Sequence, residues 1–201
     1  LDNVGKRSFV QRRIVFSHGD GTSSNGFIDC YRRGAFVLEA KKIRDGAVKA
    51  GAGNQSFDDA MLRARSQAEN YARALPATEG RPPLVLVVDV GHVIEMYAEF
   101  SRSGATYTPF PDVTSHRIRL DALCDDTPAG AALRARLRAA WLDPLTLDPG
   151  RASARVTRDV SVLLAELARL LEDAGHAPHS VSAFLSRCLF CMFAEDVGLL
   201  P

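Results

Sequence analysis

The sequence lacks the features that mark membrane, secreted and strongly charged proteins. It contains four cysteines in 201 residues, too few for a disulfide scaffold, and no apolar run long enough to cross a membrane. No signal peptide is evident at its start. The net charge of +1 excludes a strongly basic protein. We therefore expect a cytoplasmic globular protein with no membrane partner and with one substantial core or two small ones.

Lysine is also scarce, since the chain has only four lysines against 21 arginines. One of the four, Lys41, ends the segment 26–41, GFIDCYRRGAFVLEAK. Its pattern predicts a β-hairpin with strands at 27–31 and 35–41 and a turn at 32–34, where Gly34 is free to take positive φ. Because side chains alternate along a strand, we expect Glu39 and Lys41 on the same face.

Three polar side chains of this hairpin point to a metal site. If the turn centres on Gly34, Asp29 lies opposite Glu39, and directly opposed carboxylates repel each other. A divalent cation between them would remove this repulsion, and a site with only oxygen ligands suits Mg²⁺. Lys41 points to the same place, where it would orient or deprotonate an attacking water or stabilise negative charge. The alternative is an edge hairpin with an unpaired acidic residue and a solvated basic turn.

The segments on either side add two further candidates. A strand is expected at 12–17, followed by a Gly- and Ser-rich loop at 18–25, in which His18 lies near the metal or is simply exposed. A Gly- and Ala-rich stretch at 45–55 precedes a helix. In this helix Gln67 and Tyr71 are i, i+4 neighbours. On periodicity alone, Tyr71 packs in the core and Gln67 lies on the rim. The apolar face of the helix consists of Met61, Ala64, Ala68, Tyr71 and Leu75.

Further strands are expected at 84–90, 93–100, 106–108 and 117–120. The run LVLVVDV at 84–90 is typical of a strand buried on both faces, with Asp89 near its end capping a turn at Gly91. The alternating run VIEMYAEF at 93–100 predicts a half-exposed strand. The order strand, hairpin, helix, buried strand, strand favours an α/β fold with a mixed sheet flanked by helices.

From about residue 121 the strand-like runs stop. Helices are predicted at 129–141, around the apolar positions between 156 and 171, and from Pro178 onward, with Gly175 as a stop between the last two. Cys188 and Cys191 form a CxxC pair in the last helix. The other cysteines lie far away in sequence, so we expect this pair to pack in the core rather than to bind zinc. The chain is therefore divided into an α/β domain at 1–120 and an all-α region at 121–201.

The spacing of Asp29, Glu39 and Lys41, D-x9-E-x-K, resembles that of the PD-(D/E)XK nucleases. Four segments in order, GFIDCYRRGAFVLEAKK, SQAENYARAL, PPLVLVVDVGHVIEMYAEF and FLSRCLFCMFAEDVGLLP, are similar to the N-terminal region of the MmeI-like (type IIL) restriction–modification enzymes. In that family one polypeptide carries a nuclease domain, a helical connector, an adenine-specific DNA methyltransferase and a target-recognition domain. The chain begins without Met and shows no methyltransferase motif, so we expect a fragment of such a polypeptide.

The resemblance implies a Mg²⁺-dependent endonuclease that hydrolyses phosphodiester bonds in double-stranded DNA, with Mn²⁺ as a possible substitute. Asp29, Glu39 and Lys41 would be the nuclease triad. Gln67 would be a supporting residue, and Ala40 would offer its backbone carbonyl to the metal. Residues from about 121 onward would be the helical connector.

The resemblance also implies partners and leaves an alternative open. Arg32, Arg33 and Lys42 are candidates for DNA contact, since residues 1–50 hold ten Lys or Arg against five Asp or Glu. That excess suits phosphates, or it is ordinary surface charge. The methyltransferase and target-recognition domains of the same polypeptide would be partners, and S-adenosylmethionine would bind only in the methyltransferase. The alternative is a DNA-contacting scaffold in a protein whose activity is adenine methylation.

Overall fold

The computed structural model describes residues 8–17, 19–42 and 55–199. The chain divides into two compact units, Leu1–Asp148 and Pro149–Pro201. His18, a candidate metal neighbour from the sequence, lies outside the described residues, as does most of the Gly- and Ala-rich stretch at 45–55.

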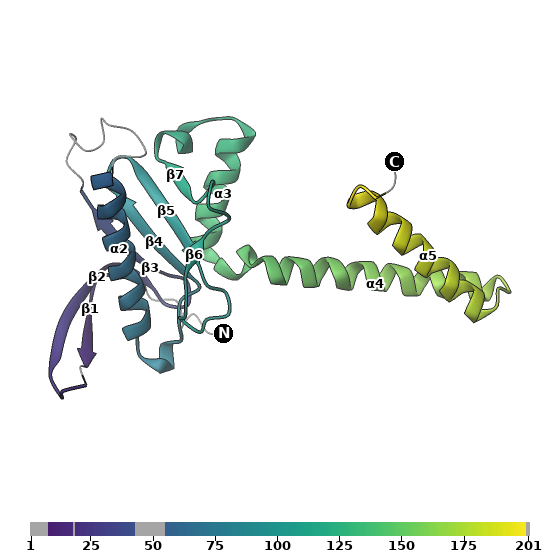
Figure 1. The fold of residues 1–201 in the computed structure, drawn as a ribbon, viewed down its shortest axis with the longest axis horizontal. Helices are drawn as coiled ribbons and strands as arrows, with labels where there is room; N and C mark the ends of the chain where they lie inside the picture. Colours follow the sequence, from purple (N-terminus) through teal and green to yellow (C-terminus); the bar gives the residue numbers. More distant parts are fainter. Residues whose placement is uncertain (1–7, 18, 43–54, 200–201) are drawn as a thin grey trace. The chain divides into compact units, whose positions relative to one another are not determined.

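The first unit is built on a seven-stranded sheet (Figure 1). The order is β1-β2-β3-β4-β5-β6, with β7 also paired to β5. β3 and β4 are parallel and the other pairs are antiparallel, so the predicted mixed α/β sheet is confirmed. Residues 23–25, expected in a loop, belong instead to β2 because they pair with β1. The strands are β1 (Ser8–Ser17), β2 (Ser23–Arg32), β3 (Phe36–Lys41), β4 (Leu84–Asp89), β5 (Val93–Ala98), β6 (Thr108–Pro109) and β7 (Arg117–Arg119).

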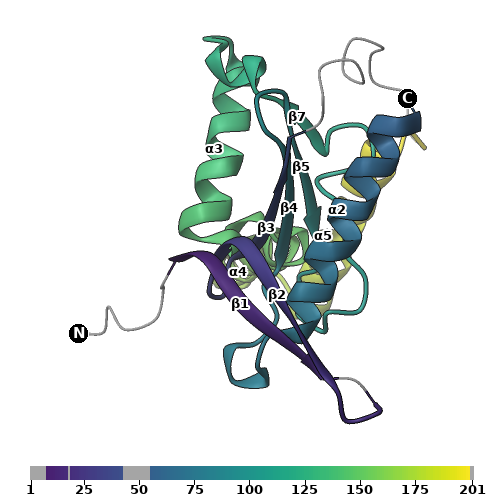
Figure 2. The ribbon, with the colours of Figure 1, turned by 90° about the vertical axis from the view of Figure 1, so that its left-hand side faces the viewer.

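One face of the sheet is covered by α2 (Gln55–Ala74), as Figure 2 shows. This helix forms the crossover that joins the parallel strands β3 and β4, which no short turn could connect. Its predicted apolar face is confirmed, since all five positions from Met61 to Leu75 are buried. The sheet residues that pack with them are Val37, Val85, Val87, Val93 and Tyr97.

The opposite face is covered by α3 (Pro128–Leu142), so the unit has three layers (Figure 2). Ala140 is buried against this face, and the rings of Trp141 and Phe36 lie 5.3 Å apart. Two short 3-10 helices, η2 (Asp121–Cys124) and η3 (Pro144–Leu147), flank α3, and a third, η1 (Ala77–Glu79), follows α2. The first unit therefore extends to Asp148, beyond the boundary expected after residue 120, because α3 supplies half of the sheet's cover.

The two central strands are both buried. For β4 this was predicted, but the prediction of a half-exposed strand at 93–100 is wrong for β5, where Val93, Glu95, Met96 and Tyr97 are buried. Alternation along β5 sorts its side chains between two covered faces, one under α2 and one under α3. Sequence alternation alone does not distinguish a covered face from a solvated one.

The second unit consists of α4 (Pro149–Asp173) and α5 (Pro178–Asp196). Between them Gly175 has φ +92°, as expected of the predicted stop. Val181, Leu185 and Ala194 of α5 are buried. The expectation that both cysteines of the CxxC pair pack in the core is wrong for Cys191, which is exposed, while Cys188 is half-buried. No helix among the described residues is long and apolar enough to span a membrane.

Candidate active site

The hairpin of β2 and β3 has the predicted register. Cys30 pairs with Leu38, Tyr31 with Val37 and Arg32 with Phe36, so the numbers of paired residues sum to 68. Gly34 has φ +70° in the turn. The ladder stops at Cys30 and Leu38, one step before Asp29 and Glu39, so the structure does not form the predicted strand pair between these two residues.

Beyond the end of the β2–β3 ladder, the side chain of Asp29 hydrogen-bonds to the backbone of β3. Its Oδ2 accepts a hydrogen bond of 2.8 Å from the backbone N–H of Ala40. The N–H and C=O of one strand residue point toward the same neighbouring strand. The Ala40 carbonyl therefore points toward β2 and Asp29, and the Lys41 carbonyl toward β4, where Val90 N–H donates to it at 2.8 Å.

β2 is irregular at Asp29. Ile28 and Tyr31 both pack in the core under α2, although a regular strand would place residues three apart on opposite faces. The β1–β2 ladder pairs residues 10 with 30 and 12 with 28, with no pair at Gln11, whose φ is +55°. This φ is uncommon for a residue other than glycine. The irregularity changes the direction of the side chain at Asp29, and the carboxylate of this residue reaches the backbone of Ala40.

Glu39 and Lys41 lie on the face of β3 that α2 covers. Glu39 is only 2% exposed, and its Oε1 accepts a 2.6 Å hydrogen bond from Lys41 Nζ. Its Oε2 is buried and has no hydrogen-bond partner among the described residues. Burial raises the pKa of Glu39, the bond to Lys41 opposes that rise, and the charge of Asp29 adds to it. The site thus holds a buried carboxylate oxygen with unused capacity for a cation.

Gln67 of α2 joins this group, as the sequence suggested. Its Oε1 lies 3.2 Å from Lys41 Nζ, and its Nε2 donates to the hydroxyl of Tyr71 at 2.9 Å. Tyr71 is buried and stacks on Phe16 of β1, with ring centroids 5.7 Å apart. The two expectations for this pair therefore combine, because Tyr71 packs in the core and from there holds Gln67 at the site.

Gly26 and Asp89 are two neighbours of the site for which the sequence suggested no such role. A Cβ on Gly26 would lie 2.4 Å from Cε1 of Tyr71, so only glycine allows the tyrosine ring to take its place. Asp89 is the partner of Lys41 in the β3–β4 register, is fully buried, and its Oδ2 lies 3.0 Å from His92 Nδ1. In the sequence, Asp89 stands out only as an acidic residue in an apolar run, and no local pattern distinguishes Gly26.

The three candidate DNA contacts do not come together. Arg32 and Arg33 lie at the hairpin turn, at the opposite end of β3 from Lys41. The Arg32 guanidinium lies 5.3 Å from the Trp141 ring centroid, and an Arg33 Nη atom donates to Thr78 O at 3.0 Å. Lys42 is exposed and follows Lys41 directly. Of the three, Lys42 alone adjoins the candidate site.

The donor set fits a hard divalent cation. The described residues contain no group of three or more His, Cys, Asp or Glu suited to a metal. Asp29, Glu39 and the Ala40 carbonyl offer oxygen alone. Mg²⁺ is commonly bound by one or two carboxylates and keeps several water ligands, so this small set suits it.

Comparison with protein families accounts for nearly the whole chain. Residues 1–174 match the model of the MmeI N-terminal domain, and residues 179–201 match that of the MmeI helicase spacer domain. No curated protein and no solved structure gives a significant match. The first match covers the sheet-based unit and also α4 of the second unit, and the second match covers α5 from its second residue onward. This chain therefore belongs to the MmeI family, as the N-terminal region of a type IIL restriction–modification enzyme.

Proposed function

We propose that this chain carries the Mg²⁺-dependent DNA endonuclease activity of the restriction–modification enzyme, in a fold of the PD-(D/E)XK kind. The observation that supports it best is the state of Glu39. A buried carboxylate with one oxygen bound to Lys41 and the other without a hydrogen-bond donor is costly, and a cation would offset that cost. Asp29, on the neighbouring strand β2, accepts a hydrogen bond from the backbone of Ala40, whose carbonyl points toward the same strand.

The proposed ligands are the carboxylates of Asp29 and Glu39 and the backbone carbonyl of Ala40. Bound Mg²⁺, or Mn²⁺ in its place, supplies a Lewis acid for the phosphoryl oxygen and lowers the pKa of coordinated water. S-adenosylmethionine has no part in this site and belongs to the proposed methyltransferase region of the same polypeptide.

Lys41 is the proposed cation for the reacting phosphate. In hydrolysis a water adds to phosphorus, one P–O ester bond breaks, and a proton passes from the water to the leaving oxygen. Lys41 Nζ already donates to Glu39 and Gln67, and an ammonium has three N–H donors. The third N–H remains to orient the water or to stabilise charge on the phosphoryl oxygens. Gln67 fixes the direction of that donor from the side of α2.

The substrate proposed is double-stranded DNA, acted on in the cytoplasm. Lys42 is placed for a phosphate contact beside the site, while Arg32 and Arg33 would reach DNA only at the turn end of the hairpin. The net charge of +1 suits a cutting centre that other domains direct to its target. We propose the target-recognition and methyltransferase domains of the same polypeptide for that role.

Cleavage of supercoiled plasmid by the protein that carries this chain tests the proposal. With Mg²⁺ we expect nicked or linear product, and none with EDTA. Asp29→Ala and Lys41→Ala are expected to lower the cleavage rate by at least about 100-fold, because each removes a group that acts on the reacting phosphate. Asp173→Ala, at an exposed position of α4, is the control. Wild-type rates in both site variants would overturn the nuclease and favour the DNA-contacting scaffold.

A further inference from the structure

A groove runs between α2 and the end of β1, on the outer side of the candidate site. Its volume is about 970 Å³, and it is lined by residues 15–17 of β1 and by one face of α2 between Leu62 and Ala74. Figure 2 shows the β1–β2 hairpin beside this helix. The groove is larger than a metal-bound water or a single phosphate requires.

The groove opens onto the catalytic constellation through a shared residue. Gln67 lines it and also bonds to Lys41, with 3.2 Å between Oε1 and Nζ. Tyr71 and Phe16, the stacked pair that holds Gln67, form part of its wall. A polymer that presents one phosphate to Lys41 would therefore continue directly into this groove.

The polar lining suits a polyanion. The lining residues include Arg63 and Arg73 and no acidic residue. Arg63 is exposed and makes no hydrogen bond or ion pair with another described residue. Arg73 is fixed by Glu69 and by the carbonyls of Gly104 and Ala105. Among the described residues, none binds the Arg63 guanidinium, so its donors face the groove.

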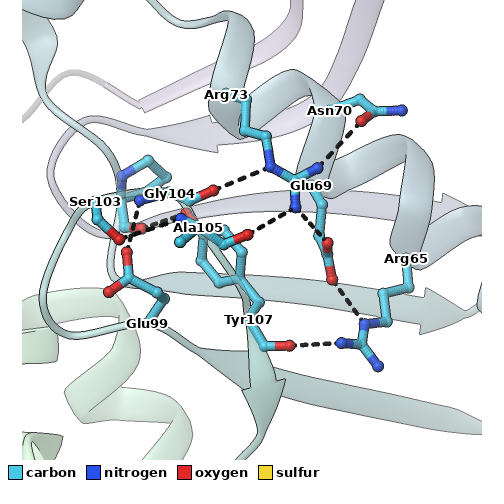
Figure 3. A network of polar contacts seen from close by, with 10 residues as sticks. Arg65, Glu69, Asn70, Arg73, Glu99, Ser103, Gly104, Ala105 and Tyr107 are labelled. Atoms are coloured by element: carbon cyan, nitrogen blue, oxygen red, sulfur yellow. Dashed lines mark hydrogen bonds and ion pairs between the residues drawn. The ribbon is translucent and has the colours of Figure 1, made fainter.

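Two further donors share the helical face of Arg63. Ser66 and Asn70 follow it at i+3 and i+7, within about 60° around the helix at 3.6 residues per turn. The Asn70 Oδ1 accepts from Arg73, so its amide nitrogen is turned the other way, as Figure 3 shows. From Arg63 to Asn70 the helix rises roughly 10.5 Å at 1.5 Å per residue. Three nucleotide steps of a duplex strand rise by about the same length, at roughly 3.4 Å each.

Contacts between α2 and the loop after β5 hold the groove-lining face of α2 in place. Arg65 and Arg73 both bind Glu69, and they reach the carbonyls of Tyr107, Gly104 and Ala105, tying α2 to the loop after β5 (Figure 3). Glu99 in turn accepts from the Gly104 N–H at 2.7 Å. The groove is therefore preformed, and little ordering of α2 would accompany binding.

We propose that this groove binds the sugar–phosphate backbone of the DNA strand next to the phosphate at Lys41. Arg63, Ser66 and Asn70 donate to phosphates along three nucleotide steps of that strand, and the exposed side chains of Val15 and Leu62 contact the sugars. The proposal rests on the proposed function for its substrate class, and it adds the path that the strand takes away from the cutting centre.

Fluorescence anisotropy with a 20-base-pair duplex and its single strand, in EDTA, tests the groove without cleavage. Arg63→Glu and Ser66→Glu each place a carboxylate on the proposed path, and we expect each to weaken binding about tenfold at 100 mM salt. Arg63→Ala should lower the slope of log affinity against log salt by about one. Arg138→Glu is the matched control, because Arg138 is an exposed helical arginine of α3, on the other face of the sheet.

Loss of affinity in both groove variants, with the control within twofold of wild type, supports the groove. If the groove variants lose affinity for the single strand alone, the groove binds an unpaired strand. If they lose affinity for both probes, the groove binds the backbone of a duplex. Unchanged binding by Arg63→Glu and Ser66→Glu, or an equal loss in Arg138→Glu, overturns it. Metal-dependent cleavage that requires Lys41 but ignores both groove variants refutes the groove and leaves the nuclease standing. The reverse result refutes the nuclease and keeps the DNA groove.

Discussion

At Glu39 the chain buries a carboxylate whose pKa is raised above its ordinary value of 4.5 by burial. The folded protein therefore holds this proton more tightly than the unfolded chain does. The contribution of Glu39 to stability is most favourable below pH 4.5 and declines as the pH rises through the folded pKa. At neutral pH, without metal, ionisation of Glu39 therefore reduces the stability of the folded protein.

We predict that Glu39→Gln raises the melting temperature of the metal-free protein at pH 7. The amide still accepts from Lys41 and carries no charge to bury. Removal of the buried charge should raise the melting temperature by roughly 2–4 °C, which corresponds to about 1 kcal/mol for a chain of this size. The gain should vanish near pH 4. Thermal unfolding followed by circular dichroism at both pH values measures it.

Glu79→Gln supplies a control of opposite sign. Arg12 and Tyr31 both bond to Glu79, and the bond from Arg12 lowers its pKa. Its contribution is present above pH 4.5 and is lost as the pH falls, so Glu79→Gln should lower the melting temperature at pH 7. A drop in both variants at pH 7 would contradict the account of Glu39.

Metal binding offers a second prediction at the same residue. Mg²⁺ or Mn²⁺ at 100 times its dissociation constant should stabilise the wild-type protein by about 2.7 kcal/mol. Asp29→Asn and Glu39→Gln should abolish that shift, because each removes a proposed ligand. A metal-dependent shift of wild-type size in both variants would place the cation elsewhere.

Gly26 is the residue on which the position of Tyr71 depends. We predict that Gly26→Ala destabilises the protein by roughly 1–3 kcal/mol, the range for overpacking, and slows cleavage because Gln67 loses its anchor. Gly19→Ala is the matched control in the same hairpin, since a Cβ there meets nothing within 4 Å. Urea unfolding and plasmid cleavage measure the two effects. Equal stability of the two variants would contradict the proposed packing.

At the scale of elements, β7 joins the sheet to α2 through one arginine. Arg117 binds Glu95, which is 1% exposed, and Asp58 at the start of α2, each at 2.5 Å. The hydroxyl of Tyr97 also donates to Glu95, at 2.7 Å. Arg119, two residues along the same strand, pairs with Asp121 of η2, and both side chains are exposed.

We predict that Arg117→Ala costs on the order of 2–3 kcal/mol, because it leaves a buried carboxylate without its cation. Arg119→Ala should cost less than about 1 kcal/mol, as solvated ion pairs usually do. Chemical denaturation of both variants compares two arginines two residues apart on one strand. If the two variants lose similar amounts of unfolding free energy, burial of Glu95 does not account for the contribution of Arg117.

At the scale of the whole chain, α3 decides where the first unit ends. It covers a sheet face that includes Phe36, Leu84, Met96 and Ile118. We predict that a protein ending at Asp148 unfolds cooperatively and is monomeric, whereas one ending at Leu120 exposes this face and aggregates. Size-exclusion chromatography and thermal unfolding distinguish the two. A stable, monomeric protein ending at Leu120 would support the boundary expected from the sequence alone.

The sequence by itself determined what depends on neighbours along the chain. Gly34 sets the turn, the turn sets the register, and strand alternation puts Glu39 and Lys41 on one face. Helical periodicity likewise fixed the buried stripe of α2 and the relation of Gln67 to Tyr71. These features follow from backbone sterics and from the repeat of each element, which act over a few residues.

Only the tertiary structure decided which faces were covered and which polar groups met. The burial of β5, the bond from Ala40 to Asp29, the approach of Tyr71 to Gly26 and the stacking of Arg32 over Trp141 all join residues from different elements. Such contacts depend on how the layers pack, and a local sequence pattern does not specify which element will cover a given face. For this reason the sequence could name the catalytic candidates, while the groove beside Gln67 emerged only once α2 and β1 were placed side by side.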